Sequence, residues 1–404
     1  MTKRWRRNLW ATWFAELLAI MGFSSSTPIW SYYIQELGVP PESVAQWSGI
    51  IISASSLTMG VMGPIWGALS DRYGRKLMVL RAMFGGAVIL GLMGFIRSVE
   101  QMTVLRLLQG ALTGTVAAAT TLVASSTPRE RLGETLGKLQ LAIFLGQSIG
   151  PITGGLVADT LGYRATFWLT SFYLLAAFFL MLFLVHEDFT PPPPTTEQGP
   201  LWRRFWQDTT VLFAGSALGL VLLLRFALRV GLQVPAPTVP LLVQELLPAG
   251  TSWLGSASGL LTTVSGITSA IAAPLLGRLG DQRGGRGLLL TSGMVMAGAI
   301  GIQAWAPTYA VLVVAQAILG FAVGGTLAII SAYIGRCAPE GRAGAAYGLD
   351  TLAVALSGAI GPTTGGWLGS AFSLRMPFYV GGVSTFLAGL AVLWLPRDAK
   401  VREA

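Results

Sequence analysis

The stretch at residues 63–81, GPIWGALSDRYGRKLMVLR, decides the fold. An apolar run over residues 50–69 ends there in Ser-Asp-Arg-Tyr-Gly-Arg-Lys, and a second apolar run follows at once. Two apolar helices joined by a short charged turn form a hairpin whose turn lies at a water interface of a membrane. Gly67 and Gly74 allow a sharp turn or a close approach of two backbones. The stretch therefore predicts two neighbouring membrane helices.

The composition of the whole chain agrees with a membrane protein. Of its 404 residues, 53% are hydrophobic and 11% are charged, and the mean hydropathy is +0.63, whereas soluble domains carry about 25% charged residues. A spanning helix needs about 20 apolar residues, and the chain offers about twelve such runs. Its 51 glycines are typical of closely packed membrane helices. We therefore predict an all-α integral membrane fold.

The net charge of +9 reflects an uneven distribution of Lys and Arg over the predicted loops. With twelve spans, 21 of the 27 basic residues fall on one side of the membrane. Three fall on the other side (Arg97, Arg164 and Arg375), and three fall inside spans. Because basic loops stay in the cytoplasm, we expect both termini to be cytoplasmic. The distribution explains the charge without a nucleic-acid partner.

The second half of the chain repeats the first. Three sets of residues recur 209 to 211 positions later. They are Gly22, Pro28 and Gln35 (as Gly231, Pro237 and Gln244), Pro64, Gly67, Asp71 and Gly74 (as Pro274, Gly277, Asp281 and Gly284), and Gly150, Pro151 and Gly154 (as Gly361, Pro362 and Gly365). So small a drift indicates two pseudo-symmetric six-helix bundles. We predict bundles over residues 1–186 and 207–404, a proline-containing cytoplasmic linker over 187–206, and a substrate site between the bundles near mid-membrane.

The spacing Gly67-x-Leu69-x-Asp71-Arg72-x-Gly74-Arg75-Lys76 resembles the signature loop between the second and third helices of the major facilitator superfamily. The resemblance extends over nearly the whole chain and implies the twelve-helix fold of a transporter, not an enzyme. It also implies a conformational latch that closes the cytoplasmic side in the outward-open state. The latch residues would be Gly67, Asp71, Arg72, Gly74 and Arg75. Many relatives add an acid at the end of the fourth helix, where this chain has Ser125 and Ser126, so the full charge relay is in doubt.

Two more motifs resemble those of drug:proton antiporters in this superfamily. In the fourth span, the sequence from Arg106 to Gly110 (RLLQG) resembles a motif whose arginine takes part in proton transfer. The alternative is that Arg106 reaches the outer interface. In the fifth span the antiporter motif comprises Gly137, Gly146, Gly150, Pro151, Gly154 and Gly155.

The antiporter glycines at every fourth position, Gly146, Gly150 and Gly154, form one smooth helix face. We expect Gly150 and Gly154 to lie against a helix of the other half, in the eighth or eleventh span, so that the two helices can slide. Pro151 permits a kink in the same helix. The alternative is ordinary packing of small residues.

Two acids are predicted inside spans, Glu16 in the first and Asp350 in the eleventh. A carboxyl group in apolar surroundings can exchange protons near neutral pH, so both are candidates for proton coupling. The alternative is an acid neutralised by a structural arginine. Arg225 follows Glu16 by 209 residues, which makes the two positions equivalent in the repeat. Because the first and seventh spans face each other across the cavity in the superfamily that this chain resembles, the resemblance implies that these two side chains oppose each other there. Arg229 lies on the same helix face as Arg225.

The first span also carries aromatic residues, Trp13, Trp30 and Tyr33. If they face inward they line the substrate cavity together with Glu16, and if they face outward they contact lipid. The sequence leaves both possibilities open.

With these motifs the chain resembles the bacterial multidrug:proton antiporters of this superfamily, which implies a protein of the inner membrane. We expect a monomer, surrounded by membrane lipid, that exports lipophilic or amphiphilic small molecules in exchange for protons. No metal or cofactor is expected, and the sequence has no Gly-x4-Gly-Lys-Ser/Thr phosphate loop. Two alternatives stay open: a lipid or glycolipid translocase on the same fold, favoured by the arginines inside spans, and a non-transporting receptor or scaffold.

Overall fold

The computed structural model describes residues 4–128, 131–187, 189, 217–338 and 343–395, and this part of the chain is helical without strands. Most of the predicted linker, residues 190–206, lies outside the described residues. The N-terminal half contains α1 (Arg4–Ser25), η1 (Thr27–Ile29), α2 (Trp30–Glu36), α3 (Pro41–Tyr73), α4 (Arg75–Met93), α5 (Val99–Leu112), α6 (Thr115–Ser126), α7 (Leu132–Leu161) and α8 (Tyr163–Leu184). The C-terminal half contains α10 (Ala217–Gln233), α11 (Val239–Leu246), α12 (Leu254–Arg283), α13 (Gly285–Ala304), α14 (Tyr309–Cys337), α15 (Ala343–Ala371), α16 (Met376–Ala391) and η3 (Val392–Trp394).

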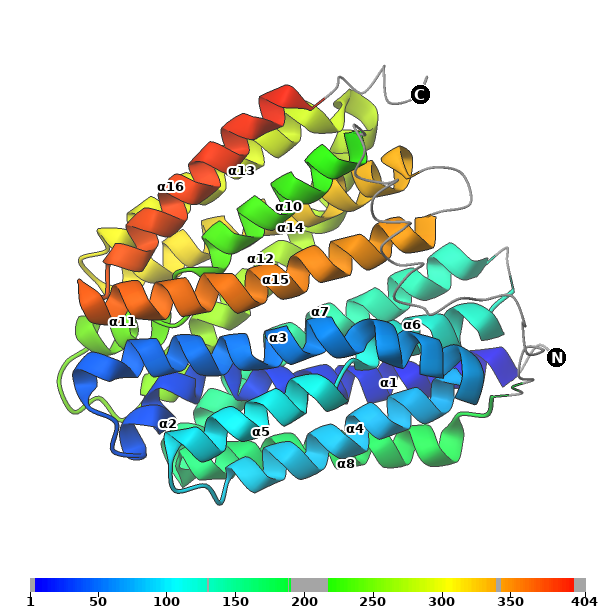
Figure 1. Ribbon diagram of the computed structural model, residues 1–404, viewed down its shortest axis with the longest axis horizontal. Helices are drawn as coiled ribbons and strands as arrows, with labels where there is room; N and C mark the ends of the chain where they lie inside the picture. The colour runs from blue at the N-terminus through cyan, green and yellow to red at the C-terminus, as the bar shows by residue number, and fades with distance from the viewer. Residues whose placement is uncertain (1–3, 129–130, 188, 190–216, 339–342, 396–404) are drawn as a thin grey trace.

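The helices run between two ends of the molecule (Figure 1). At the terminal end, the start of α1 lies beside the end of α8, where Arg7 Nη2 and His186 Nδ1 are 3.0 Å apart. At the opposite, distal end, α2 meets α11, and Gln35 Nε2 donates to Gln244 Oε1 at 2.9 Å. Figure 1 shows the helices of the two halves diverging from the distal end toward the terminal end.

Two helix pairs join the halves, α3 with α15 and α7 with α12. A Cβ atom on Gly49 of α3 would lie 2.3 Å from the Pro362 carbonyl oxygen, and one on Gly259 of α12 would lie 2.3 Å from the Pro151 carbonyl oxygen. Only glycine permits so close an approach. Gly49 and Gly259 occupy equivalent positions in the two repeats, and so do Pro151 and Pro362. The α3–α15 and α7–α12 pairs therefore form two equivalent seams between the halves. The repeat found in the sequence is thus confirmed in three dimensions.

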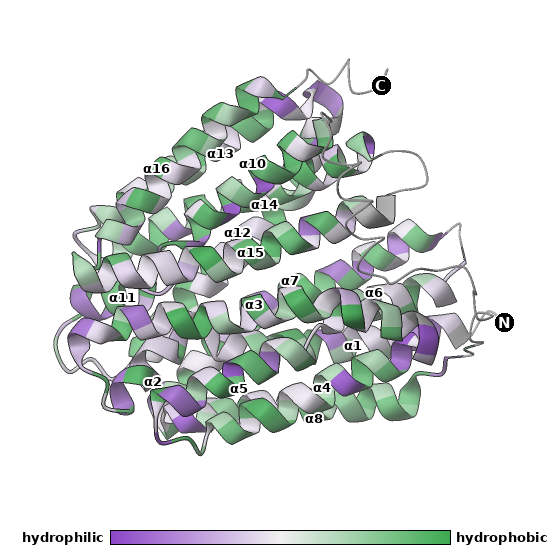
Figure 2. Cartoon of the chain, in the orientation of Figure 1, coloured by the Kyte–Doolittle hydropathy of each residue, from purple (hydrophilic) through white to green (hydrophobic). Residues whose placement is uncertain are grey.

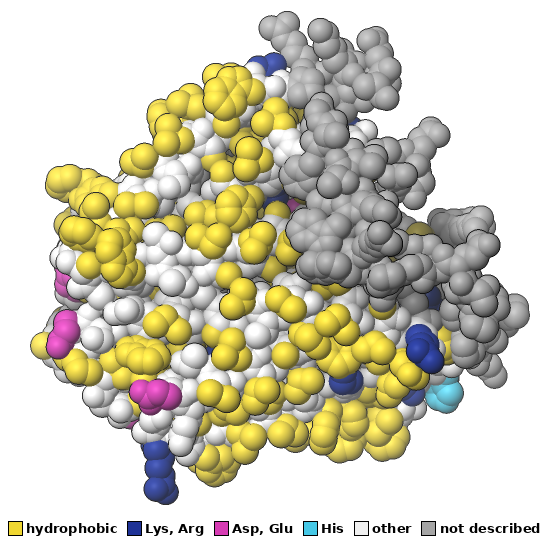
Figure 3. Space-filling model, in the orientation of Figure 1, with side chains coloured by type: hydrophobic (Ala, Val, Ile, Leu, Met, Phe, Trp, Pro, Cys, Tyr) yellow, Lys and Arg dark blue, Asp and Glu magenta, His cyan; other side chains and the backbone are white. Residues whose placement is uncertain are grey.

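The surface suits a membrane. Apolar residues run along the helices in Figure 2. On the face in Figure 3, hydrophobic side chains cover the middle, while acidic side chains gather near the distal end. Within the described residues, nine helical segments are long and apolar enough to span a bilayer, with α5 and α6 counted together. The predicted spans that carry internal acids or paired arginines, α1, α10 and α15, are not among the nine. The twelve-span count therefore stays a prediction.

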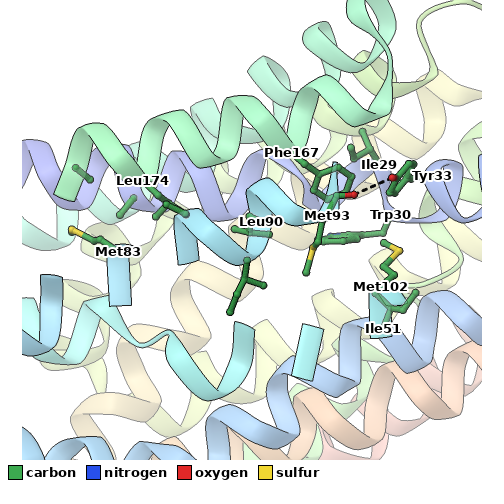
Figure 4. Packing of buried hydrophobic residues seen from close by; sticks show 14 of the residues in the cluster. Ile29, Trp30, Tyr33, Ile51, Met83, Leu90, Met93, Met102, Phe167 and Leu174 are labelled. Atoms are coloured by element: carbon green, nitrogen blue, oxygen red, sulfur yellow. Dashed lines mark hydrogen bonds between the residues drawn. The ribbon is translucent and has the colours of Figure 1, made fainter. Parts of the chain in front are cut away.

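The N-terminal half has a packed interior of its own (Figure 4). Trp30 and Tyr33 pack against Phe167 of α8, with ring centroids 5.3 and 5.0 Å apart. The Tyr33 hydroxyl donates to the Met93 carbonyl of α4 at 3.0 Å. Tyr33 is fully buried and Trp30 is nearly so. These contacts tie the distal part of the first predicted span to α4 and α8.

Candidate functional site

The first acid, Glu16, is fully buried in α1 beside a break in the fourth predicted span. The break separates α5 from α6 at Gly114, whose φ of +125° is open to glycine but strained for other residues. Thr115, the first residue of α6, donates from Oγ1 to Glu16 Oε2 at 3.3 Å. Glu16 Oε1 has no hydrogen-bond partner among the described residues. The carboxyl group therefore lies at the positive end of a short helix with half of its hydrogen-bonding capacity unused.

The arginine of the fourth span, Arg106, is buried and has only uncharged partners. Its guanidinium donates to the Ile51 carbonyl at 3.0 Å, to Ser55 Oγ at 2.6 Å and to Gln109 Oε1 at 2.6 Å. It also lies 4.6 Å from the centre of the Trp30 ring. Arg106 thus does not reach the outer interface. It joins α5 to α3, and its assignment to proton coupling stays a prediction.

The second acid, Asp350, forms an ion pair with Arg225. The Arg225 Nε and Asp350 Oδ1 atoms are 3.1 Å apart, and the two side chains are only 10% and 16% exposed. Arg225 thus has its ion-pair partner in Asp350, and the expectation that Glu16 and Arg225 oppose each other across the cavity stays a prediction. Glu16 and Arg225 occupy equivalent positions in their own halves. Each, however, bonds to a residue on a neighbouring helix of its own half, Glu16 to Thr115 of α6 and Arg225 to Asp350. For Arg225 that helix is α15.

The second arginine of α10, Arg229, has no such partner. Its Nε atom is buried and makes no hydrogen bond to any described residue. Arg225 and Arg229 line a small cavity that is otherwise mostly apolar. The other lining residues are Leu228, Leu232, Met296, Val323, Thr326, Leu327 and Ile330. Together with Asp350 the two arginines form a charged cluster in the C-terminal half.

The aromatic residues of the first span do not form one lining. Trp30 and Tyr33 lie inside the N-terminal half, so the structure gives them neither a cavity-lining nor a lipid-facing position. Trp13 is partly exposed, and its Nε1 atom donates to the Lys138 carbonyl of α7 at 2.9 Å. The sequence could not separate these cases, because α1 and α2 together form a bent span whose faces change direction at η1.

The smooth face of the antiporter motif lies against the same half, which corrects our expectation. Added Cβ atoms on Gly146, Gly150 and Gly154 would lie 2.8 Å from Ile20 Cβ, 2.1 Å from Ser24 Oγ and 2.0 Å from the Ser25 carbonyl oxygen. All three of those contacts belong to α1. Spacing by four residues defines a face, but only the assembled bundle decides which helix that face meets.

The next positions around the helix make the contact with the other half. A Cβ atom on Gly155 would lie 2.3 Å from the Gly255 carbonyl oxygen of α12. Thr263 of α12 donates to the Ser148 carbonyl at 2.6 Å. Near the terminal end, by contrast, Gly137 has no atom within 4 Å of an added Cβ. The antiporter motif therefore has one face within its half and another at the seam.

The charged turn that opened the sequence is held by its own half. Gly74 ends α3 with a φ of +97°, and α4 begins at Arg75. The Glu187 carboxylate accepts hydrogen bonds from the Arg75 and Lys76 backbone N–H groups at 3.0 and 2.8 Å. The Arg72 guanidinium lies 5.5 Å from the Tyr73 ring centre, Gly67 has no atom within 4 Å of an added Cβ, and the Asp71 side chain lies outside what the structure describes. The hairpin is confirmed, whereas the latch stays a prediction.

Sequence reasoning missed two residues that close the distal end. Asp159, near the end of α7, accepts hydrogen bonds from the Gly255 and Ser256 N–H groups at 2.8 and 2.7 Å, and so caps α12 from the other half. The Tyr32 hydroxyl donates to the Pro240 carbonyl and lies 2.8 Å from Ser258 Oγ. The sequence repeat could have pointed to Asp159, because Ser370 occupies the equivalent position in the second half. In the structure Ser370 plays a similar role between α15 and α3, where its Oγ atom accepts a hydrogen bond from the Gln46 N–H group at 3.0 Å.

Comparison with known proteins defines the class of this fold. The family model of the Major Facilitator Superfamily matches residues 12–245 and 221–404. The solved structure of a mutant of the nucleoside transporter NupG superimposes with a TM-score of 0.81 at 14% identity, covering 96% of this chain and 99% of that chain. The human organic anion transporter MFSD10 superimposes with a TM-score of 0.71 at 18% identity, over 96% and 99% of the two chains. The fold is that of a membrane transporter.

Curated relatives match over nearly the full length. The Multidrug resistance protein MdtG of Rahnella sp. (strain Y9602) is 31% identical over 400 residues, 97% of this chain and 94% of that protein. The Multi-drug resistance efflux pump PmrA of Streptococcus pneumoniae serotype 4 is 29% identical over 375 residues, 93% of this chain and 92% of that protein. This chain belongs to the major facilitator superfamily, as a multi-pass membrane transporter and not an enzyme.

Proposed function

We propose that this protein exports lipophilic or amphiphilic small molecules in exchange for protons, as a multidrug antiporter of the bacterial inner membrane. The names of its relatives MdtG and PmrA support multidrug efflux. The observation that carries proton exchange is Glu16, a fully buried acid with an unpartnered oxygen and no charged partner among the described residues. A carboxyl group of that kind is more stable neutral than charged, and can carry one proton per cycle.

The arrangement of the two halves supports alternating access. We place the terminal end in the cytoplasm, because the basic loops fall on that side. The hydrogen bonds that join α2 to α11 and α7 to α12 then close the outer side, and the diverging helices of Figure 1 open toward the cytoplasm. In this proposal the structure is inward-facing. The charged turn at residues 70–76 is the latch, released here and closed in the outward-facing state.

The test uses everted membrane vesicles with an imposed pH gradient, acid inside. Three probes are offered: tetraphenylphosphonium, tetraphenylborate and a fluorescent phospholipid. Gradient-dependent accumulation of either small ion supports the exporter. Movement of the phospholipid alone supports a lipid translocase, for which the two arginines of α10 are the favouring observation. If no probe moves in response to the gradient, the proposal is wrong.

The residues are tested in the same vesicles. Glu16→Gln and Asp350→Asn are expected to abolish or sharply reduce gradient-driven accumulation while the protein remains folded. Both variants keep the side-chain shape and remove the exchangeable proton. Gly133→Ala is the control, because an added Cβ there meets no atom within 4 Å. Normal pumping by both variants, singly and combined, would remove the proton-carrier assignment.

A further inference from the structure

The charges of the described residues inside α10 and α15 do not balance. Arg225 and Arg229 contribute two positive charges, and Asp350, which is bound to Arg225 and also acts on Arg229, contributes one negative charge. The Nε atom of Arg229 has no acceptor among the described residues. An uncompensated charge within a membrane protein is costly and marks a functional site. The cluster therefore carries a net positive charge that favours one further anionic group.

The geometry suits an anionic group attached to an apolar molecule. Arg225 and Arg229 are four residues apart, so both side chains leave the same face of α10. The cavity beside them is lined mostly by aliphatic side chains of α10 and α14. A guanidinium group binds planar or tetrahedral oxyanions through parallel N–H donors. The cavity measures only about 20 Å³, so it has room for little more than the anionic head itself, such as a carboxylate, sulfonate or phosphate.

A comparison with two other arginines inside helices of this chain sharpens the point. Arg106 donates to three uncharged acceptors. Arg81 lies over the Trp66 ring, 3.4 Å from its centre, although its Nε and Nη1 atoms, like Nε of Arg229, make no hydrogen bond to a described residue. Arg106 and Arg81 therefore each have a protein group beside them that takes up the cation. Arg229 instead shares one carboxylate, that of Asp350, with a second cation, Arg225, and lies at a cavity.

We propose that Arg225 and Arg229 form a subsite for an anionic group of the transported molecule, so that this exporter takes organic anions. The inference rests on the proposed export function and narrows its substrate class. Asp350 competes with the bound anion for Arg225, and Arg229 supplies the charge that draws the anion in. The membrane potential, negative inside, then favours outward movement of the anion, by about 2.3 kcal/mol per charge per 100 mV.

The test measures equilibrium binding to the purified full chain in phosphatidylcholine nanodiscs. Naphthalene-2-sulfonate and 2-naphthyltrimethylammonium serve as probes, because they share an apolar ring system and differ in the sign of the charged head. We expect the parent protein to bind the sulfonate more tightly. Arg229→Gln should weaken sulfonate binding about 10-fold or more, as expected for a lost charge-assisted contact, and should leave ammonium binding equal or stronger.

Two further variants fix the sign of the effect. Arg229→Lys keeps the charge and should retain part of the preference for the sulfonate. Asp350→Asn removes the competing carboxylate and should strengthen sulfonate binding. Arg81→Gln removes a partly buried cation from the other half and should change the binding of neither probe, as a matched control. The proposal is overturned if Arg229→Gln binds the sulfonate as the parent does, or if the parent prefers the ammonium.

A last arm identifies the source of the anion. Replacing part of the phosphatidylcholine by phosphatidylglycerol should leave sulfonate binding by the parent unchanged when the subsite serves a free organic anion. If phosphatidylglycerol instead weakens binding of the anionic probe to the parent but not to Arg229→Gln, the subsite binds a lipid headgroup. That result would overturn the proposal that the protein exports organic anions. Binding is measured without a gradient, so a failure of proton coupling in vesicles leaves this result intact.

Discussion

Adjacent glycines of α7 allow packing within a half to be separated from packing between halves. In Gly155→Ala the new Cβ atom would lie 2.3 Å from the Gly255 carbonyl oxygen of α12. In Gly154→Ala it would lie 2.0 Å from the Ser25 carbonyl oxygen of α1. Ordinary van der Waals contact begins near 3.4 Å, so either substitution must move backbone by about 1 Å, at an overpacking cost of roughly 1–3 kcal/mol.

The two costs fall on different equilibria. In the proposed alternating access, the contact between α7 and α12 is present only while the distal end is closed, so Gly155→Ala should destabilise that state alone. A cost of 1–3 kcal/mol corresponds to a shift of about 5- to 150-fold toward the distally open state. The contact of α1 with α7 lies within one half and persists in both states. Gly154→Ala should therefore lower thermal stability and leave the balance of states unchanged.

The assay measures distances between spin labels on Glu100 and Pro307, exposed residues at the distal ends of the two halves, in a Cys337→Ser background. Gly155→Ala should add or enlarge a long-distance population, and Gly154→Ala should reproduce the parental distribution with a lower Tm. The reasoning is refuted if Gly155→Ala leaves the distances unchanged, or if Gly154→Ala shifts them equally.

The remaining predictions concern the distal cap, the break in the fourth span and the latch. Asp159→Asn should weaken the cap on α12 by about 1–2 kcal/mol and enlarge the same long-distance population; an unchanged distribution would show that the cap does not hold the seam. Gly114→Ala must place a Cβ at a φ of +125°, at a cost of roughly 1–2 kcal/mol, so we expect a lower Tm and slower export. The control Gly133→Ala should retain the parental Tm. Equal Tm values for the two variants would contradict a strained break. Asp71→Asn should weaken latch closure by roughly 1–3 kcal/mol and enlarge the population in which labels on the terminal ends of α3 and α15 are far apart, and unchanged distances there would rule out its latch role.

The sequence alone determined the architecture of this protein. Apolar runs interrupted by charged turns admit only helices in a bilayer, because backbone polar groups must bond internally there. The recurrence of Gly67, Asp71 and Gly74 at 277, 281 and 284 was enough to predict two related halves. The embedded residues Glu16 and Arg225 were also visible, because an ionisable side chain is conspicuous in an apolar run.

Only the tertiary structure decided which of these residues meet. Helix periodicity defines faces, but the neighbour of each face depends on how the helices assemble. Gly150 and Gly154 therefore face α1, while Gly155, next to Gly154 in the sequence, faces α12. Asp350 reaches Arg225 because α15 packs on α10, and Glu16 lies at the start of α6 because the fourth span breaks at a glycine. Such contacts join residues about 100 or more positions apart, and no local pattern specifies them.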